Sequence, residues 1–485
     1  MLFQSIEFLI FLPIVFLLYW FVFKKLKVQN ALVLVASYVF YGWWDWRFLI
    51  LIAITSGFSY WSGLLIKNSE GNQRKQKWIC AGNIILNLLI LFAFKYLNFF
   101  SESLVALFAL FGIHLDWVTL KIILPVGISF YTFQALSYTI DVYRKKIEPT
   151  RDVVAFFAFI SFFPQLVAGP IERATNLLPQ FLKPRKFDYA AAVDGCSQML
   201  WGFFKKIVVA DNCAVYVNQV FESYQDQTGS TLLLAAVFFT FQIYGDFSGY
   251  SDIAIGAAKL FGVRLMRNFN VPYFSRDIAE FWRRWHISLT TWFRDYIYIP
   301  LGGSRVSKVK VIRNTFIIFL VSGLWHGANW TFIAWGAYHA LLFLPLILLG
   351  KNRKNTNIVA EGRLLPSFGE FSRMLLTFAL VVIGWIIFRA ESIGQAWEYI
   401  CGIFDASLLS VPWLKTRFYY IPLFVFICIM LVVEWLQRDK QHGMNEFKIG
   451  SKTTTYIVFI IIGLVIAYYF LNSLGSPTNF IYFQF

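Results

Sequence analysis

The sequence predicts an all-α protein with many membrane-spanning helices, and three observations support this prediction. Of its 485 residues, 58% are hydrophobic and only 14% are charged, whereas a soluble domain carries roughly a quarter charged residues. Apolar runs close to the ~20 residues that a spanning helix needs recur from end to end. No polar linker separates them, so we expect one integral-membrane domain over residues 1–485.

About twelve spans are expected. The first is retained, because the N-terminus has neither a basic start nor a small-residue cleavage site. A further apolar stretch, 152–169, is interrupted at Pro164 and ends in Gly169-Pro170, which favours a broken, re-entrant helix. The spans lie near 6–23, 30–46, 48–66, 78–98, 121–143, 192–217, 231–262, 312–325, 329–349, 371–389, 419–437 and 454–471.

The loops between the spans differ in charge. Because basic side chains gather in cytoplasmic loops, we expect both termini outside the cytoplasm and 312–349 as a hairpin with His326 at its top or midpoint. Basic loops that meet anionic lipid explain the formal net charge of +16 better than a nucleic-acid partner does. The basic loops are 24–27, 67–77, 144–151, 305–313, 351–355 and 438–452, and the other loops lie near 45, 99–120, 222–230 and 472–485.

The five cysteines are an odd number and are not closely spaced. This pattern predicts neither a disulfide framework nor a zinc site. We therefore expect no metal centre.

His326 lies in "SGLWHGANW", residues 322–330, between two apolar segments. An ionisable side chain at membrane depth is costly and usually faces a cavity, a partner or a pathway. Imidazole suits proton transfer near neutral pH. A histidine needed only for packing fits equally well, since Gly323 and Gly327 favour close helix approach. We expect His339 to be structural.

Residues 276–303 are too polar to span but have a helical pattern. One amphipathic helix at the cytoplasmic interface is expected, with His286 at the edge of its aromatic stripe. His286 then either reaches lipid headgroups or lines a cytoplasmic entrance. The stripe is Phe281, Trp285, Leu289, Trp292 and Tyr296, with Arg283, Thr290 and Arg294 opposite and Trp282 and Phe293 beside His286.

The span 231–262 carries Asp246 and Asp252. Acidic side chains within a span must be paired or hydrated. We expect Arg264 or Arg267 to pair with Asp252 near the cytoplasmic end, and a purely structural role stays open.

Taken together, these segments closely resemble the membrane-bound O-acyltransferase family. The resemblance rests on "YFSRDIAEFWRRWHISLTTWFRDYIYIPLGG" (273–303) followed by "SGLWHGANWTFIAWGAYHA" (322–340). Three further segments look like the bacterial polysaccharide-acetylation branch of that family, and the resemblance covers almost the whole chain. They are "ISFYTFQALSYTIDVYR" (128–144), "FFPQLVAGPIER" (162–173) and "IYGDFSGYSDIAIGAAKLFGV" (243–263).

The resemblance implies a ring of helices in the bacterial inner membrane, around a tunnel that holds His286 and His326 of the segment 275–350. It also implies a cytoplasmic thioester donor, acetyl-CoA or an acyl carrier protein, and an extracytoplasmic polysaccharide such as alginate, reached through a partner transferase.

Acyl transfer to a hydroxyl needs a base and oxyanion donors. His326, nearer the outer face, is the expected base, and His286 positions the thioester or stabilises the developing charge. Tunnel-lining candidates are Trp282, Trp285, Trp325, Asn329 and Asp246, and donor-phosphate candidates are Arg283, Arg284 and Arg294.

The aromatic tail 472–485 ends in "NFIYFQF" and resembles the C-terminal motif of a companion protein in D-alanylation systems. By that resemblance, Tyr482 accepts acetyl as an aryl ester and passes it outward. An aromatic belt at the outer interface is the alternative.

Other functions stay open. The same mechanism would serve peptidoglycan O-acetylation or D-alanyl transfer. A proton-coupled transporter that uses both histidines and both aspartates belongs to another class, although neither histidine motif has the second copy that an internal repeat would give. A scaffold without chemistry of its own is the third possibility.

Overall fold

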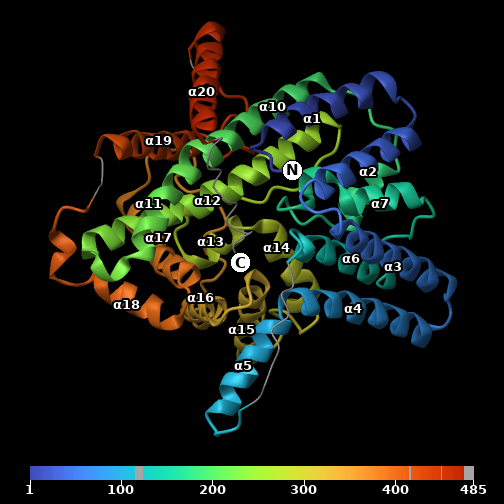
Figure 1. Cartoon of the computed structure of the whole chain (residues 1–485), viewed down its shortest axis with the longest axis horizontal. Helices are drawn as coiled ribbons and strands as arrows, with labels where there is room; N and C mark the ends of the chain where they lie inside the picture. The colour runs from blue at the N-terminus through green and yellow to red at the C-terminus, as the bar shows by residue number, and fades with distance from the viewer. Residues whose placement is uncertain (115–123, 414–416, 449, 474–485) are drawn as a thin grey trace. The chain divides into compact units, whose positions relative to one another are not determined.

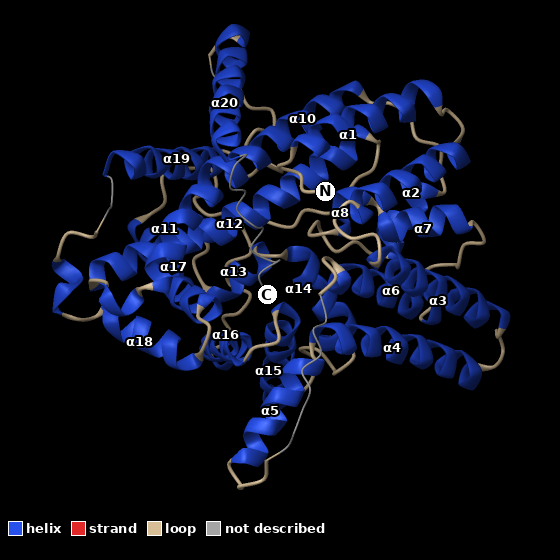
Figure 2. Cartoon of the chain, viewed as in Figure 1, coloured by secondary structure: helices blue, strands red, loops and turns tan. Residues whose placement is uncertain are grey.

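The computed structural model describes residues 1–114, 124–413, 417–448 and 450–473. Across these ranges every regular element is a helix and none is a strand (Figure 2), which confirms the all-α class. The chain divides into two compact units. The first unit comprises Met1–Ala192 with Ala258–Leu265, and the second comprises Val193–Ala257 with the chain from Met266 onward. A single membrane domain over 1–485 stays a prediction.

In the first unit, α3, α4 and α6 pack against one another (Figure 1). Asn83 of α4 donates from its side-chain nitrogen to the hydroxyl of Ser62 in α3, at 3.2 Å. Polar bonds of this kind join helices that have apolar surroundings. The elements are α1 (Ile6–Leu17), η1 (Leu18–Val22), α2 (Leu26–Gly42), α3 (Phe48–Asn68), α4 (Gln73–Lys95), α5 (Leu97–Ala109), α6 (Ile128–Tyr143), α7 (Val153–Ser161), α8 (Phe163–Leu166) and α9 (Ala174–Phe181).

The second unit holds every described residue of the expected site. Its elements follow α10 (Tyr189–Phe203), which begins in the first unit. They are η2 (Phe204–Ala210), α11 (Asp211–Glu222), η3 (Tyr224–Asp226), α12 (Gly229–Leu260), η4 (Pro272–Phe274), α13 (Ile278–Arg284), α14 (Ile287–Phe293), η5 (Arg294–Tyr298), α15 (Lys308–His326), α16 (Trp330–Leu348), α17 (Phe368–Arg389), α18 (Ile393–Ile403), η6 (Ala406–Leu409), α19 (Arg417–Leu436) and α20 (Lys452–Ser473).

Several helices have the length and composition to cross a membrane. Among the described residues there are 6 of them, namely α3, α4, α12, α16, α17 and α20, and shorter apolar helices cover Ile6–Val22, Leu97–Ala109 and Tyr420–Leu436. The apolar window of α20 is 0% buried, and this helix projects from the rest of its unit (Figure 1). Such a helix needs lipid around it. The protein is therefore a multi-pass membrane protein.

Some predicted boundaries were wrong. The loop expected over 99–120 contains most of α5, whose 13 residues are too few to form the apolar run of a spanning helix. The helix expected over 276–303 is broken after Arg284, so α13 and α14 are separate. The break predicted in 152–169 is confirmed, because α7 ends at Ser161 and α8 begins at Phe163.

The helices α15 and α16 form the predicted hairpin. Gly327 has an extended backbone that ends α15 at His326, and Asn329 caps α16 by accepting a hydrogen bond from the Thr331 N–H at 3.0 Å. The two helices approach closely at glycines. A Cβ atom on Gly323 would collide with the carbonyl oxygen of Phe332, and one on Gly336 would collide with that of Phe319. The predicted close approach at Gly323 is confirmed, and Gly336 adds a second point of contact.

Adding a methyl group at this contact tests the packing. We expect Gly336→Ala to cost about 1–3 kcal/mol of stability, because the new Cβ meets backbone atoms that move only with their helix. The measurement is the midpoint of thermal unfolding of the detergent-purified protein. Gly463→Ala on α20 is the matched control, since its Cβ would meet no atom within 4 Å. Equal midpoints for the two variants would contradict the close approach.

Candidate active site

His286 lies at the break between α13 and α14, in the left-handed backbone region with φ 44° and ψ 52°. Such a conformation costs a non-glycine residue about 1–3 kcal/mol and persists only when its surroundings hold it. Two backbone hydrogen bonds bracket the break, from Asn270 N–H to the Arg284 carbonyl (2.9 Å) and from Ile287 N–H to the Asn268 carbonyl (2.8 Å). The side chain of His286 is only 1% exposed. It therefore points into the protein and not toward lipid headgroups.

Aromatic rings surround the His286 imidazole. The ring centroids of Phe247, Trp325 and Phe269 lie 4.6, 5.8 and 6.4 Å away. Its Nδ1 lies 3.1 Å from Oδ1 of Asn268, while its Nε2 has no hydrogen-bond partner in the described part of the chain. Burial lowers the pKa of His286 to about 3, because an imidazolium in these surroundings would lose its hydration. The imidazole is therefore neutral at physiological pH.

His326 ends α15 and is 5% exposed. Its ring centroid lies 4.9 Å from that of Trp325, 5.1 Å from that of Trp335 and 5.3 Å from that of Phe388. Trp325 thus contacts both His326 and His286. The two histidines come from separate motifs of the sequence, and the fold brings them to the same indole ring.

Two other predicted tunnel residues belong to the same aromatic cluster. Trp282 donates from Nε1 to Nδ1 of His339 at 3.3 Å, and Trp285 is 1% exposed. His339 also lies 5.0 Å, between ring centroids, from Trp335, the ring that contacts His326. The hairpin therefore brings His339 closer to His326 than one continuous helix would.

Asn329 and Asp246 have partners that position helices. Besides capping α16, Asn329 donates to the carbonyl oxygen of Glu391 at 3.0 Å. Asp246 forms an ion pair with Lys206 of η2 at 2.5 Å, and Lys206 also pairs with Asp211 at 2.8 Å. These contacts fix the N-terminal end of α16 and the middle of α12.

The predicted partner of Asp252 was wrong. Its carboxylate pairs with Lys205 at 2.6 Å and accepts a hydrogen bond from Gln198 at 2.8 Å. Because η2 is a π-helix, its wide turn presents the adjacent lysines 205 and 206 to two acids of α12 that are six residues apart. Sequence periodicity based on α-helices could not predict this pairing.

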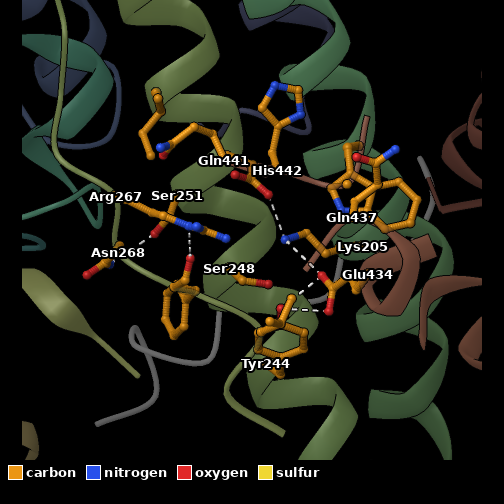
Figure 3. A pocket seen from close by; sticks show the side chains of 16 residues that line it. Lys205, Tyr244, Ser248, Ser251, Arg267, Asn268, Glu434, Gln437, Gln441 and His442 are labelled. Atoms are coloured by element: carbon orange, nitrogen blue, oxygen red, sulfur yellow. Dashed lines mark hydrogen bonds and ion pairs between the residues drawn. The ribbon is translucent and has the colours of Figure 1, made fainter. Parts of the chain in front are cut away.

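A polar cavity lies beside His286, because Asn268 and Phe269, which contact His286, also line the cavity. Figure 3 shows the cavity, with Asn268 among its labelled residues. About 400 Å³ lies between its atoms, part of it open to solvent. Its polar groups are mostly paired. Glu434 accepts a hydrogen bond from the Tyr244 hydroxyl at 2.8 Å. The walls are formed by Trp201, Lys205, Tyr244, Ser248, Ser251, Asp252, Ile255, Arg267, Asn268, Phe269, Val271, Glu434, Gln437, Gln441, His442 and Gly443.

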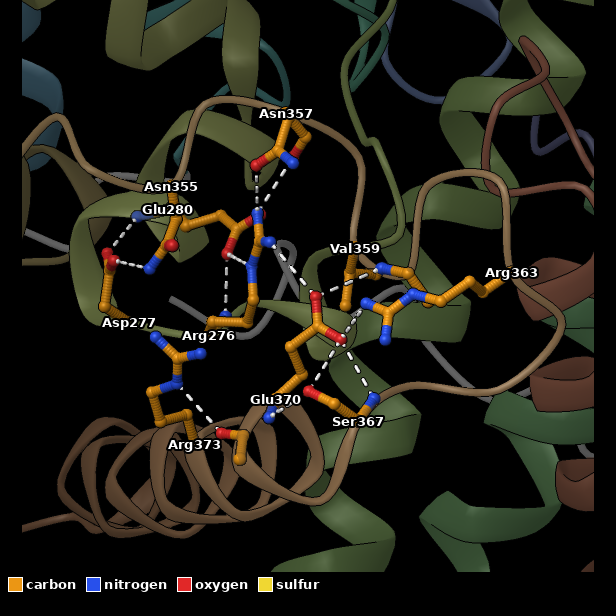
Figure 4. A network of polar contacts seen from close by, with 12 residues as sticks. Arg276, Asp277, Glu280, Asn355, Asn357, Val359, Arg363, Ser367, Glu370 and Arg373 are labelled. Atoms are coloured by element: carbon orange, nitrogen blue, oxygen red, sulfur yellow. Dashed lines mark hydrogen bonds and ion pairs between the residues drawn. The ribbon is translucent and has the colours of Figure 1, made fainter.

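The three predicted donor-phosphate arginines have different surroundings. Arg284 is buried and donates to Glu280 at 2.8 Å, and Glu280 also binds Arg276 in the network of Figure 4. Arg283 is exposed and donates to backbone carbonyls. Arg294 is exposed and pairs with Asp295 at 2.7 Å. Only Arg283 and Arg294 are open to a ligand from solvent.

Tyr482 lies outside the described residues. Within the described part, no group of three or more histidine, cysteine or acidic side chains is arranged to hold a metal ion. Sequence reasoning missed Asn268 and Lys205. The signal for Asn268 was its place in a short polar stretch directly after a span.

Known proteins share most of this chain. The sequence profile of the membrane-bound O-acyltransferase family matches residues 149–387. The Pseudomonas aeruginosa protein named "probable alginate O-acetylase AlgI" is 44% identical over 407 residues, which cover 84% of this chain and 75% of that protein. The peptidoglycan O-acetyltransferase of Helicobacter pylori is 31% identical over 98% of this chain and 95% of its own length. A teichoic acid D-alanyltransferase of Bacillus subtilis is 26% identical over 69% of this chain and 84% of its own length.

The matched region contains both histidine motifs and the helices around them. Together with the relatives' similarity over most of their length, this establishes that the chain belongs to the membrane-bound O-acyltransferase family and is an acyltransferase.

Proposed function

We propose that this protein is an integral-membrane O-acetyltransferase that moves acetyl from a cytoplasmic thioester across the membrane, for O-acetylation of an extracytoplasmic polysaccharide such as alginate. The observation that carries the proposal is the pair His286 and His326, both buried and both in contact with Trp325. The alginate O-acetylase relatives, at 40–44% identity, support the choice of polymer.

His326 acts as the general base. The acceptor hydroxyl oxygen attacks the thioester carbonyl carbon, and its proton passes to the imidazole. The carbon–sulfur bond then breaks, and the departing sulfur takes up that proton. Burial in an aromatic cluster supports this role, because it excludes the water that would otherwise hydrolyse the thioester.

The donor is acetyl-CoA or the thioester of an acyl carrier protein. We assign the polar cavity beside His286 to the donor, since Arg267, Gln437 and Gln441 line it next to segments whose basic loops predict a cytoplasmic position. Arg283 and Arg294, both exposed, are the candidates for its phosphates.

The proposed architecture is a ring of about twelve spans around a tunnel in the bacterial inner membrane, with both termini outside. Trp282, Trp285, Trp325 and Asp246 line or support the tunnel. A partner transferase on the outer side receives the acetyl group and delivers it to the polymer. The break between α7 and α8 and the unburied apolar helix α20 are compatible with such a ring.

Two alternatives remain testable. Peptidoglycan O-acetylation or D-alanyl transfer would use the same two histidines, as suggested by the names of the more distant relatives. A proton-coupled transporter would use Asp246 and Asp252 as proton carriers, but both carboxylates are held by lysines.

Removing the proposed base should abolish transfer. We expect His326→Ala to lower acetyl-CoA turnover by about 10²–10⁴-fold, measured with radiolabelled acetyl-CoA on protein in nanodiscs. His114→Ala is the matched control, because His114 is exposed outside the site. Turnover equal to the control would favour a scaffold, and proton flux without turnover in the wild type would favour the transporter.

The role proposed for the tail is tested separately. If Tyr482 carries acetyl as an aryl ester, Tyr482→Phe removes the acceptor oxygen but keeps the aromatic ring. We expect acetyl label on the tail peptide to be lost and polymer acetylation in cells to fall, while thioester hydrolysis by the purified protein persists. If polymer acetylation in this variant equals that of the wild type, Tyr482 does not carry the acetyl group and the tail is an aromatic belt at the outer interface.

A further inference from the structure

We propose that Asn268 is a positioning residue that fixes His286 as the Nδ1–H tautomer and leaves Nε2 as a hydrogen-bond acceptor for the acyl donor. The contacts of Asn268 support the tautomer, and its role in acyl transfer rests on the proposed function.

The Asn268 side chain is 0% exposed, and its partners define which end is oxygen. Oδ1 accepts from the Ser288 backbone N–H at 3.3 Å and from the Ser288 hydroxyl at 2.9 Å. Nδ2 donates to the Ser251 hydroxyl at 3.1 Å. A backbone N–H can only donate, so a flipped amide would bring two donors together. The oxygen therefore faces Ser288 and His286.

The tautomer follows from this orientation. An oxygen acceptor 3.1 Å from Nδ1 of His286 requires that nitrogen to carry the proton. A neutral imidazole has one donor and one acceptor, so Nε2 carries a lone pair. In the described chain Nε2 has no hydrogen-bond partner. A buried acceptor without a partner lowers the stability of the folded state by about 1–3 kcal/mol. This cost falls on His286, the residue whose backbone is also strained.

The lone pair on Nε2 decides between the two roles open to His286. A negative charge on the thioester oxygen needs a donor, so neutral His286 does not stabilise it through Nε2. An acceptor instead binds an N–H or O–H of the substrate. The thioester arms of CoA and of acyl carrier proteins both carry amide N–H groups, and we assign Nε2 to one of them. His286 thus positions the donor while the base acts on the acceptor hydroxyl.

The tautomer can be measured without any activity. Protein labelled with ¹⁵N-histidine is examined by solid-state NMR in lipid, and His286 is assigned by the signals that a His286→Gln variant loses. We expect a protonated Nδ1 and an unprotonated Nε2 in the wild type, and a mixture of tautomers in Asn268→Ala. A protonated Nε2 in the wild type would overturn the proposal, whatever the reaction proves to be.

Kinetics test the consequence of the tautomer. Asn268→Asp keeps the acceptor oxygen but adds a negative charge, which favours the imidazolium and raises the pKa of His286. Below that raised pKa, Nε2 becomes a donor. We therefore expect a KM for acetyl-CoA that rises as the pH falls, more steeply than in the wild type, with a smaller change in kcat.

The matched control is Asn314→Ala. Asn314 is also 0% exposed, but its side chain donates to the carbonyls of Leu301 and Gly303, away from His286. This control should lower the folded fraction without moving the pH profile. A pH profile of Asn268→Asp that matches the wild type would overturn the role in donor binding, and absence of turnover in the wild type itself would instead overturn the proposed function.

Discussion

The pairing of charged groups among apolar side chains is the constraint on which this structure depends. Lys206 is 1% exposed and is held between Asp246 and Asp211, and its neighbour Lys205 pairs with Asp252. Removing one member of such a buried pair costs about 3–5 kcal/mol, because the remaining charge is left without compensation. The approach of the helix backbones makes this pairing possible. A Cβ atom on Gly245 or Gly249 of α12 would meet the carbonyl oxygens of Lys205 or Gly202. The ion pairs and the glycines together fix η2 on α12.

This fixed helix determines the position of the candidate site. From α12, Phe247 packs edge-on against the His286 ring, and Ser251 accepts the hydrogen bond that orients Asn268. Four residues separate these two side chains, so they lie on one face of the helix. The loop of Asn268 then holds the break between α13 and α14 through backbone and side-chain hydrogen bonds. The ion pairs of α12 therefore support a strained histidine in another part of the same unit.

The sequence alone predicted the all-α class, the family and the α15–α16 hairpin, because these depend on composition, apolar run length and specific motifs. It failed where structure departs from regular helical geometry. The break at His286 was missed, since a helical pattern continues across it and the left-handed backbone is stabilised by contacts from a distant loop. Lys205 was missed as the partner of Asp252, because a π-helical turn reorients adjacent lysines. Arg284 was expected to bind the donor phosphate, but its side chain is buried beside Glu280. This burial depends on the packing of α13 against the loop after α16, and a local sequence pattern contains no information about that packing.

The aromatic cluster brings two histidines with different proposed tasks to the same indole ring. Trp325 contacts both imidazoles, and it precedes the end of α15 by one residue. The remaining contacts of the two imidazoles differ, because His326 also packs against Trp335 and Phe388, and His286 against Phe247 and Phe269. Each is then governed by its own partners, which for His286 means an amide oxygen on Nδ1. Because Nε2 of His286 is buried in this structure, the donor-binding role proposed for it requires the surroundings of His286 to open. Of the rings around His286, Trp325 also contacts His326, so the donor site proposed at His286 and the proposed base share one wall of the aromatic cluster.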